Sequence, residues 1–251
     1  MCLILLAQKP SNDFKFVMAS NRDEFYSRPT TPAHWWPDIK DLLAGKDLKQ
    51  GGTWMGMSKN GKFAAVTNVR DFYAENYSDI SYLSRGDLVK DFFISSQSPE
   101  EYISNLNYND YLGFNLCLYD QEELSFFSSK GKEEVEKENI FVLGNKKIGE
   151  ESKKINSAKE DFKNILKKNF KNSDLLKLMQ SPAEQYEFEE NTIKSRHGNE
   201  FLARFIKSKI YGTRSTTVMT INYDNVVSIS EQLYEKGGVH GSITNFEFQI
   251  K

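Results

Sequence analysis

Cys2 follows the initiator methionine directly, and a thiol at that position could act as a nucleophile on a carbonyl carbon. If Met1 is removed, Cys2 also carries the free α-amine of the chain. An α-amine titrates at about pH 7.7–8.0, so near neutral pH it can accept a proton. Nucleophile and base would then lie on one residue. A cysteine at the start of a strand is also common as core filler, and this structural interpretation stays open.

A dense cluster of polar side chains follows the second apolar run of the chain, and its members are Asn21, Arg22, Asp23 and Glu24. Arg22, together with Arg214 further along the chain, could lower the pKa of the Cys2 thiol. Arg214 could also clamp a substrate carboxylate, or serve as a structural arginine at a strand edge. The cluster itself could take part in catalysis and ligand binding, or be an ion-pair knot that holds the chain together.

Hydrolysis of an amide or ester also needs hydrogen-bond donors for the oxyanion of the tetrahedral intermediate. Asparagine side chains at strand ends suit that role, and the candidates are Asn68 and Asn156. Asn156 also has a purely structural interpretation at the start of a helix, because Ser157 and Glu160 form a capping-box pattern.

The elements that must position these residues begin with two apolar runs. Residues 2–8 and 14–20 flank a turn cluster and predict a hairpin that places Cys2 near Asn21 to Glu24. Gly56 to Lys62 matches the first part of a phosphate-binding loop, but Phe63 replaces the required Ser or Thr. Asn60-Gly61 instead predicts a tight hairpin turn, and Asn68 ends the strand that follows.

Further elements are predicted by capping residues and by apolar periodicity. Helices are expected after Ser84, after Ser98 and after Ser157, with a further short helix before Pro182. Strands are expected over 113–119, 123–128, 140–143, 213–222, 226–229 and 244–250. Strands joined by tight turns and separated by groups of helices predict an α+β protein, with antiparallel sheets covered by helices. We expect one domain over residues 1–251.

Residues 25–45 contain three prolines and are predicted to be irregular. Trp35 and Trp36 lie here, and Trp54 lies shortly after. These aromatic rings indicate either a lid packed on the core or the wall of a pocket for an apolar ligand.

Composition narrows the classes of function. The net charge of −2 gives no indication of a nucleic-acid partner, and no apolar run is long enough to span a membrane. Two cysteines, Cys2 and Cys117, give no disulfide framework, and Cys117 is expected in the core. We therefore expect a cytoplasmic protein. His34, His197 and His240 lack the spacing of metal ligands, so no metal site is expected.

Several stretches together resemble the NRDE family, also called the transport and Golgi organisation protein 2 family. They are Met1-Cys2, Asn21-Arg22-Asp23-Glu24-Phe25, Gly51-Gly52-Thr53-Trp54, Thr67-Asn68 and Tyr211-Gly212-Thr213-Arg214. That family is similar to N-terminal nucleophile (Ntn) hydrolases with a cysteine nucleophile, such as penicillin V acylases and bile salt hydrolases. The resemblance implies an αββα four-layer sandwich, Cys2 as nucleophile and base, Asn68 at the oxyanion and Arg214 near the nucleophile. It implies Asp23 or Glu24 as the acid that orients the amine, and leaves the choice open.

The resemblance implies two alternative functions. The first is hydrolysis of a C–N amide bond in a small molecule with an apolar part, for which no cofactor is required. The second is a non-catalytic carrier of haem or an acyl lipid. Its walls would include Trp35, Trp36 and Trp54, with Arg22 or Arg214 on propionates or phosphates and His34 as a possible haem ligand. A degenerate hydrolase fold that binds other proteins is a third, simpler interpretation.

Overall fold

The computed structural model describes residues 2–69, 82–131, 139–185, 187 and 203–251, and of Cys2 only the backbone. The chain divides into two compact units. The first comprises Met1–Ser27, Glu136–Gly144 and Glu151–Gln249, and the second comprises Arg28–Val135, Asn145–Glu150 and Ile250–Lys251. The chain passes between the two units several times, so neither is a continuous stretch of sequence. Whether they act as the one predicted domain stays a prediction.

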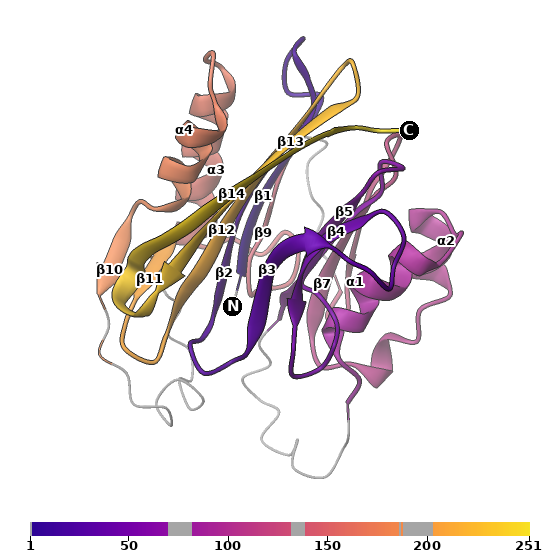
Figure 1. Cartoon of the computed structure of the whole chain (residues 1–251), viewed down its shortest axis with the longest axis horizontal. Coiled ribbons are helices and arrows are strands. Elements are labelled where there is room, and N and C mark those ends of the chain that lie inside the picture. The colour runs from indigo at the N-terminus through magenta and orange to yellow at the C-terminus, as the bar shows by residue number, and fades with distance from the viewer. Residues whose placement is uncertain (1, 70–81, 132–138, 186, 188–202) are drawn as a thin grey trace. The chain divides into compact units, whose positions relative to one another are not determined.

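The first unit is built on a six-stranded sheet in the order β14-β13-β12-β2-β1-β9 (Figure 1). Its strands are β1 (Cys2–Gln8), β2 (Phe14–Phe25), β9 (Ile140–Leu143), β12 (Tyr211–Asn222), β13 (Val226–Glu235) and β14 (Val239–Gln249). All neighbouring pairs in this sheet are antiparallel. A short parallel pair, β10 (Ala183–Gln185) and β11 (Phe205–Lys207), accompanies it. The predicted hairpin of the first two strands is confirmed, and β2 lies between β1 and β12.

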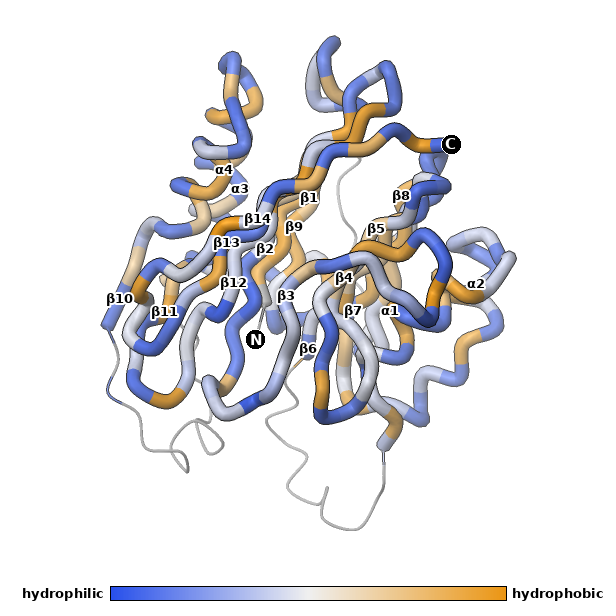
Figure 2. Tube along the Cα trace, viewed as in Figure 1, coloured by the Kyte–Doolittle hydropathy of each residue, from blue (hydrophilic) through white to orange (hydrophobic). Residues whose placement is uncertain are grey.

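Two helices cover one face of this sheet. They are α3 (Lys153–Leu166) and α4 (Asn172–Met179). Leu3, Leu5 and Ala7 alternate along β1 and pack with Val17 and Ala19 of β2 against the buried side chains of both helices. Figure 2 shows that β1 is mostly apolar, and residues 2–7 of the strand are all apolar. A strand that is apolar on both faces is expected where neither face meets water.

The second unit has its own six-stranded antiparallel sheet, in the order β3-β4-β5-β6-β7-β8. The strands are β3 (Thr30–Trp35), β4 (Leu42–Asp47), β5 (Met55–Ser58), β6 (Phe63–Asn68), β7 (Phe114–Tyr119) and β8 (Leu124–Ser128). Asn60-Gly61 makes the predicted turn between β5 and β6, with Gly61 at a φ of +85°. A positive φ costs glycine little, which explains its place there.

Helices α1 (Arg85–Ile94) and α2 (Pro99–Ser104) pack on this second sheet. Leu88, Val89 and Phe92 of α1 form a buried cluster with apolar residues of β6 and β7. Both helices begin as predicted, because Ser84 and Ser98 cap their first turns. The predicted α+β class with antiparallel sheets is confirmed in each unit. The stacking of four layers stays a prediction.

Two expectations about local structure were wrong. Residues 25–45 are not irregular, because they contain β3 and β4. Pro32 is tolerated in β3 since this strand lies at the edge of the sheet, where some N–H groups need no ladder partner. Helix α3 begins at Lys153 with Ser152 as its N-cap, five residues before the expected start after Ser157.

Among the residues that the structure describes, no helix is long and apolar enough to cross a bilayer.

Candidate functional site

The register of the central strands brings together three chain segments that carry predicted catalytic residues, namely Cys2, Arg22 to Glu24, and Arg214. Cys2 of β1 pairs with Arg22 of β2, and Arg22 pairs in turn with Ser215 of β12. The backbone of Cys2 thus lies beside the polar end of β2, as the sequence predicts. Arg214 is the extra residue of a β-bulge in β12, between the paired positions Thr213 and Ser215. Bulges often occur next to functional sites, where they re-aim side chains.

Asn21 is fully buried, with 0% of its surface exposed. Its amide nitrogen donates to the main-chain carbonyls of Met179 and Arg204, both at 2.8 Å. Its carbonyl oxygen accepts a hydrogen bond of 2.6 Å from the hydroxyl of Thr216. These contacts satisfy three of the hydrogen-bonding positions of the amide within the protein, and they give Asn21 a structural role in the core. The predicted ligand-binding role is not tested by them.

Asp23 is the buried acid of the cluster, with 1% exposure. The hydroxyl of Thr213 donates to its carboxylate at 2.7 Å, and the hydroxyl of Tyr211 donates to its main-chain carbonyl at 3.1 Å. Burial raises the pKa of the Asp23 carboxyl, while the charge of Lys154 and the bond from Thr213 oppose that rise. Lys154 was not singled out from the sequence, and Thr213 was named only as part of a family motif, without a role.

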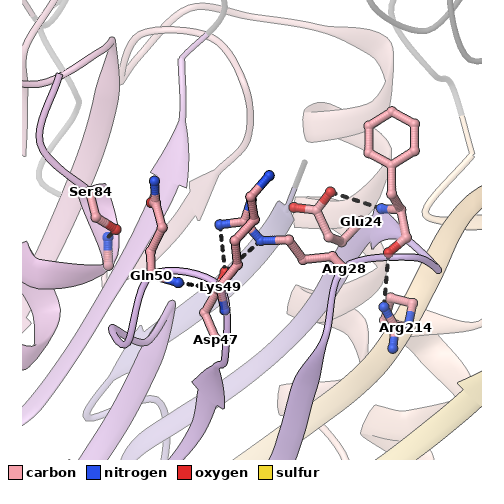
Figure 3. Close-up of polar contacts among 9 residues, drawn as sticks. Glu24, Arg28, Asp47, Lys49, Gln50, Ser84 and Arg214 are labelled. Atoms are coloured by element: carbon pink, nitrogen blue, oxygen red, sulfur yellow. Dashed lines mark hydrogen bonds and ion pairs between the residues drawn. The ribbon is translucent and has the colours of Figure 1, made fainter. Parts of the chain in front are cut away.

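Glu24 is in a different setting. Its carboxylate accepts a hydrogen bond of 2.8 Å from the main-chain N–H of Phe25, and its side chain is partly exposed (Figure 3). Successive residues of a strand point to opposite faces, so Asp23 and Glu24 do not share a face. The two acids that the resemblance left open are therefore separated by burial and by orientation.

Arg22 is buried and Arg214 is half-buried. The guanidinium of Arg214 donates to the main-chain carbonyl of Phe25 at 2.9 Å (Figure 3) and lies 5.6 Å from the centre of the Tyr26 ring. Burial lowers the pKa of Arg214, and the charge of Arg22 acts in the same direction. Arg22 pairs with Cys2 across the two strands, and its charge acts on Arg214.

The oxyanion candidates differ in their surroundings. Asn68 ends β6 in the second unit, and its main-chain carbonyl accepts a bond of 2.9 Å from the side-chain amide of Asn145. Nearby, Asn115 is buried and donates to Thr67 and to the carbonyl of Lys146. The sequence reasoning missed Asn145, although its position directly after β9 and Gly144 was a usable signal.

Asn156 lies within the first turns of α3, in the first unit, and its side chain is exposed. Its main-chain N–H donates to the carbonyl of Ser152 at 2.9 Å. The structural interpretation of Asn156 as part of a cap before Ser157 is wrong, because the helix starts earlier. Its predicted catalytic role stays a prediction.

The three tryptophans have three different environments. Trp36 belongs to a buried cluster with Leu42 and Ala44, and its indole N–H donates to the carbonyl of Ala44 at 3.0 Å. Trp35 is partly exposed, with the ammonium of Lys59 4.5 Å from its ring centre. The Trp54 ring fills the space beside Gly45, where an added Cβ would lie 2.4 Å from it. Trp36 therefore packs in the core, which agrees with the interpretation of this segment as a lid packed on the core.

The Gly51-Gly52-Thr53-Trp54 stretch has a clear structural role in the second unit. Asp47 pairs with Arg28 at 2.8 Å, and its other carboxylate oxygen accepts from the main-chain N–H groups of Lys49 and Gln50 (Figure 3). This turn delivers Gly52 to the start of α1, where a Cβ on Gly52 would lie 2.6 Å from the backbone of Gly86. Glycine is required at this close approach of two backbones.

Other kinds of site find little support in the described residues. No group of three or more histidine, cysteine, aspartate or glutamate side chains among them could hold a metal ion. A cavity of 180 Å³ in the second unit is lined by Tyr82, Tyr108, Tyr111 and Lys130, among others. Its volume is below the roughly 300–1,000 Å³ of sites for drug-sized ligands. None of its lining residues was a predicted site residue.

Comparison with known proteins adds a family. A family model described as Transport and Golgi organisation 2 matches residues 1–236. The Transport and Golgi organization protein 2 homolog of Homo sapiens is 26% identical, with both chains covered over 100% of their length. Among solved structures, a Caenorhabditis elegans N-acylethanolamine-hydrolyzing acid amidase ortholog aligns with a TM-score of 0.47 at 8% identity, covering 87% of this chain and 92% of its own. The C2A mutant of conjugated bile acid hydrolase from Clostridium perfringens aligns with a TM-score of 0.48 at 11% identity, covering 99% and 92%.

Proposed function

Because the chain belongs to the Transport and Golgi organisation 2 family, we propose that it hydrolyses a C–N amide bond in a small molecule that carries an apolar or acyl part. Cys2 is the nucleophile and, after removal of Met1, its α-amine is the base. The main support for the proposal is the register of the strands. Cys2 pairs with Arg22 of β2, and Asp23 is the next residue along that strand. The resemblance of the family's motifs to Ntn hydrolases supports it.

The reaction would proceed in two stages. The Cys2 thiol gives its proton to the α-amine and attacks the carbonyl carbon of the amide, forming a C–S bond. The C–N bond then breaks, and the leaving amine takes the proton from the α-ammonium group. A water molecule, deprotonated by the same α-amine, attacks the thioester and releases the acid and the free thiol.

We assign the orienting acid to Asp23 rather than to Glu24. Asp23 is buried and fixed by the hydroxyl of Thr213, whereas the carboxylate of Glu24 already accepts from the N–H of Phe25. A rigid, desolvated carboxylate is better suited to hold an amine in one orientation. Arg22 and Arg214 would stabilise the thiolate or an anionic group of the substrate. The resemblance implies Asn68 as the donor to the oxyanion.

We propose that the reaction needs no cofactor and that the protein acts in the cytoplasm. Its test is the intact mass and the N-terminal peptide of untagged protein, before and after treatment with a cysteine-directed acylating probe. We expect Met1 to be absent and the probe to add once, at Cys2. Cys2→Ala should abolish the labelling, while Cys117→Ala should leave it unchanged, because Cys117 is a fully buried thiol.

The opposite result would favour the carrier. Retention of Met1 together with an unreactive Cys2 would contradict the hydrolase. Titration with haem and with an acyl-CoA, followed by absorbance and calorimetry, would then measure whether either ligand binds. Saturable binding that is unaffected by Cys2→Ala would make the carrier the working model.

A further inference from the structure

One face of α3 is apolar along almost its whole length. Ala158, Phe162 and Leu166 are buried in the core of the first unit, and each lies four residues after the previous one. Positions four residues apart share one face of a helix. The same spacing continued toward the N-terminus reaches Lys154, which is 8% exposed. A lysine thus occupies the core-facing position nearest the N-terminus of the helix.

Strand β2, which contributes to the same core, shows the same change from apolar to charged. Val17 and Ala19 of β2 pack in the core that α3 covers. Residues two apart share one face of a strand, so Asn21 and Asp23 continue this face beyond Ala19. Asn21 confirms the direction, because its amide bonds the carbonyl of Met179 at the end of α4. The helix-facing side of β2 therefore ends at the carboxyl of Asp23.

Two buried groups of opposite charge thus stand at the same end of one helix–sheet interface. A buried charge is tolerated when it is paired, and a lone buried carboxylate would take up a proton. We propose that Lys154 is a positioning residue, whose buried ammonium is a counter-charge that favours the ionised form of Asp23 and so helps it to hold the α-amine of Cys2. This role rests on the proposed function, whereas the pairing of the two charges does not.

Among the side chains that the structure describes, the other groups around Asp23 do not replace Lys154. Thr213 and Tyr211 of β12 supply neutral hydroxyls, one to the carboxylate and one to the main-chain carbonyl. Glu24, its neighbour on β2, carries a like charge and disfavours the ionised form. Lys154 is the side chain whose charge opposes the effect of burial most strongly.

The experiment uses two readouts on the full chain. Carboxyl carbon NMR follows the titration of Asp23, with its signal identified by its loss in Asp23→Asn. Alkylation of Cys2 by iodoacetamide, quantified on the N-terminal peptide from pH 5 to pH 9, reports the reactivity that the amine controls. Lys154→Met removes the charge and keeps the length of the side chain, and Lys154→Arg keeps the charge. Lys153→Met is the matched control, because Lys153 is exposed on the same turn of α3.

In Lys154→Met we expect the titration midpoint of Asp23 to rise by about one to three pH units. Alkylation of Cys2 near pH 7 should fall about tenfold or more, with a changed pH profile. Lys154→Arg and Lys153→Met should retain both wild-type values. An unchanged Asp23 midpoint in Lys154→Met would overturn the pairing, and an unchanged Cys2 profile would overturn the positioning role.

Two further results, an unreactive Cys2 in the wild-type protein and a Lys154→Met variant that does not fold, can be told apart from the outcomes above. If Cys2 is unreactive in the wild-type protein as well, the proposed function fails, and the Asp23 titration still decides the pairing. If Lys154→Met does not fold, the double variant with Asp23→Asn should fold, because both buried charges are then removed. Failure of the double variant to fold, when Asp23→Asn alone does fold, would also overturn the pairing.

Discussion

The side-chain amide of Asn21 and the main-chain carbonyl of Arg204 are joined by a hydrogen bond of 2.8 Å, although 183 residues separate them. The same amide bonds Met179 at the end of α4. One side chain thus fixes the polar end of β2 to the end of α4 and to the segment that leads into β11. The residues next to Asn21 are those assigned to the site, so this bond determines where they lie.

Asn21→Ala should destabilise the protein strongly. The change leaves two buried carbonyls and the hydroxyl of Thr216 without this partner, and each unsatisfied group costs about 1–3 kcal/mol. We expect the free energy of unfolding in urea to fall by at least about 2 kcal/mol. Asn164→Ala, at an exposed position of α3, is the control and should stay within about 0.5 kcal/mol. Equal effects of the two changes would contradict a structural role for Asn21.

Arg204 and Asp161 should be coupled energetically. Arg204 is 2% exposed, forms an ion pair with Asp161 and donates to the carbonyl of Leu178 at 3.1 Å. Removing the acid alone leaves a guanidinium buried, which is costly. In a double-mutant cycle with Arg204→Met and Asp161→Ala, we expect a coupling free energy of about 0.5–3 kcal/mol.

The control for this cycle is the more exposed pair of Lys146 and Glu150, whose charged atoms lie 3.0 Å apart. Its coupling should be about 0.5 kcal/mol or less, because solvent screens exposed charges. A coupling between Arg204 and Asp161 that is no larger than that of the control would show that the burial of Arg204 does not strengthen its ion pair.

Asp23 should make stability fall as the pH rises. Its pKa in the folded protein is raised above the unfolded value of 3.8, mainly by burial. Between these two values the folded state binds more protons than the unfolded state, so the stabilising effect of the protonated form is lost with rising pH. Asp23→Asn removes this dependence and keeps an oxygen acceptor for Thr213. Urea unfolding from pH 3.5 to pH 7 should therefore show the variant gaining stability relative to wild type as the pH rises. A constant difference would refute the raised pKa.

Cys117 should be unreactive in the folded protein. It is fully buried in β7, and burial raises the pKa of its thiol well above the ordinary value. In a Cys2→Ala variant we expect no alkylation by iodoacetamide at pH 8 in buffer, and complete alkylation in concentrated urea. Rapid labelling in buffer would mean that β7 opens locally, and Cys117 would then be unsuitable as the internal control for Cys2.

Local signals in the sequence predicted the elements whose ends are fixed by neighbouring residues. Asn60-Gly61 marked the turn between β5 and β6, and Ser98 marked the start of α2. The start of α3 was mispredicted because two serines compete for the cap. Ser152 caps the helix, whereas the hydroxyl of Ser157 accepts from Arg204, which is 47 residues away. The residues next to Ser157 in the sequence do not indicate a contact with a residue so far along the chain.

In the candidate site, too, local sequence placed some residues and could not place others. The hairpin pattern was enough to place Cys2 beside Arg22, because a tight turn fixes the register of the two strands. Lys154 and Thr213 could not be assigned to Asp23 from their own sequence surroundings. Thr213 bonds Asp23 because β12 pairs with β2, and the charge of Lys154 acts on Asp23 because α3 covers the same sheet. Single-sequence reasoning thus finds residues with suitable chemistry more readily than the residues that hold them in place.

The bulge at Arg214 sets the phase of β12. Thr213 and Thr216 are an odd number of positions apart, yet both hydroxyls bond side chains on the helix-facing side of β2, at Asp23 and at Asn21. In a regular strand two such residues would point in opposite directions. Because Arg214 is one extra residue, Thr213 before it and Thr216 after it both point to the helix-facing side of the sheet. Substitution there should consequently leave the sheet in place, whereas deletion of the residue would turn Tyr211 to Thr213 over and separate Asp23 from its hydroxyl.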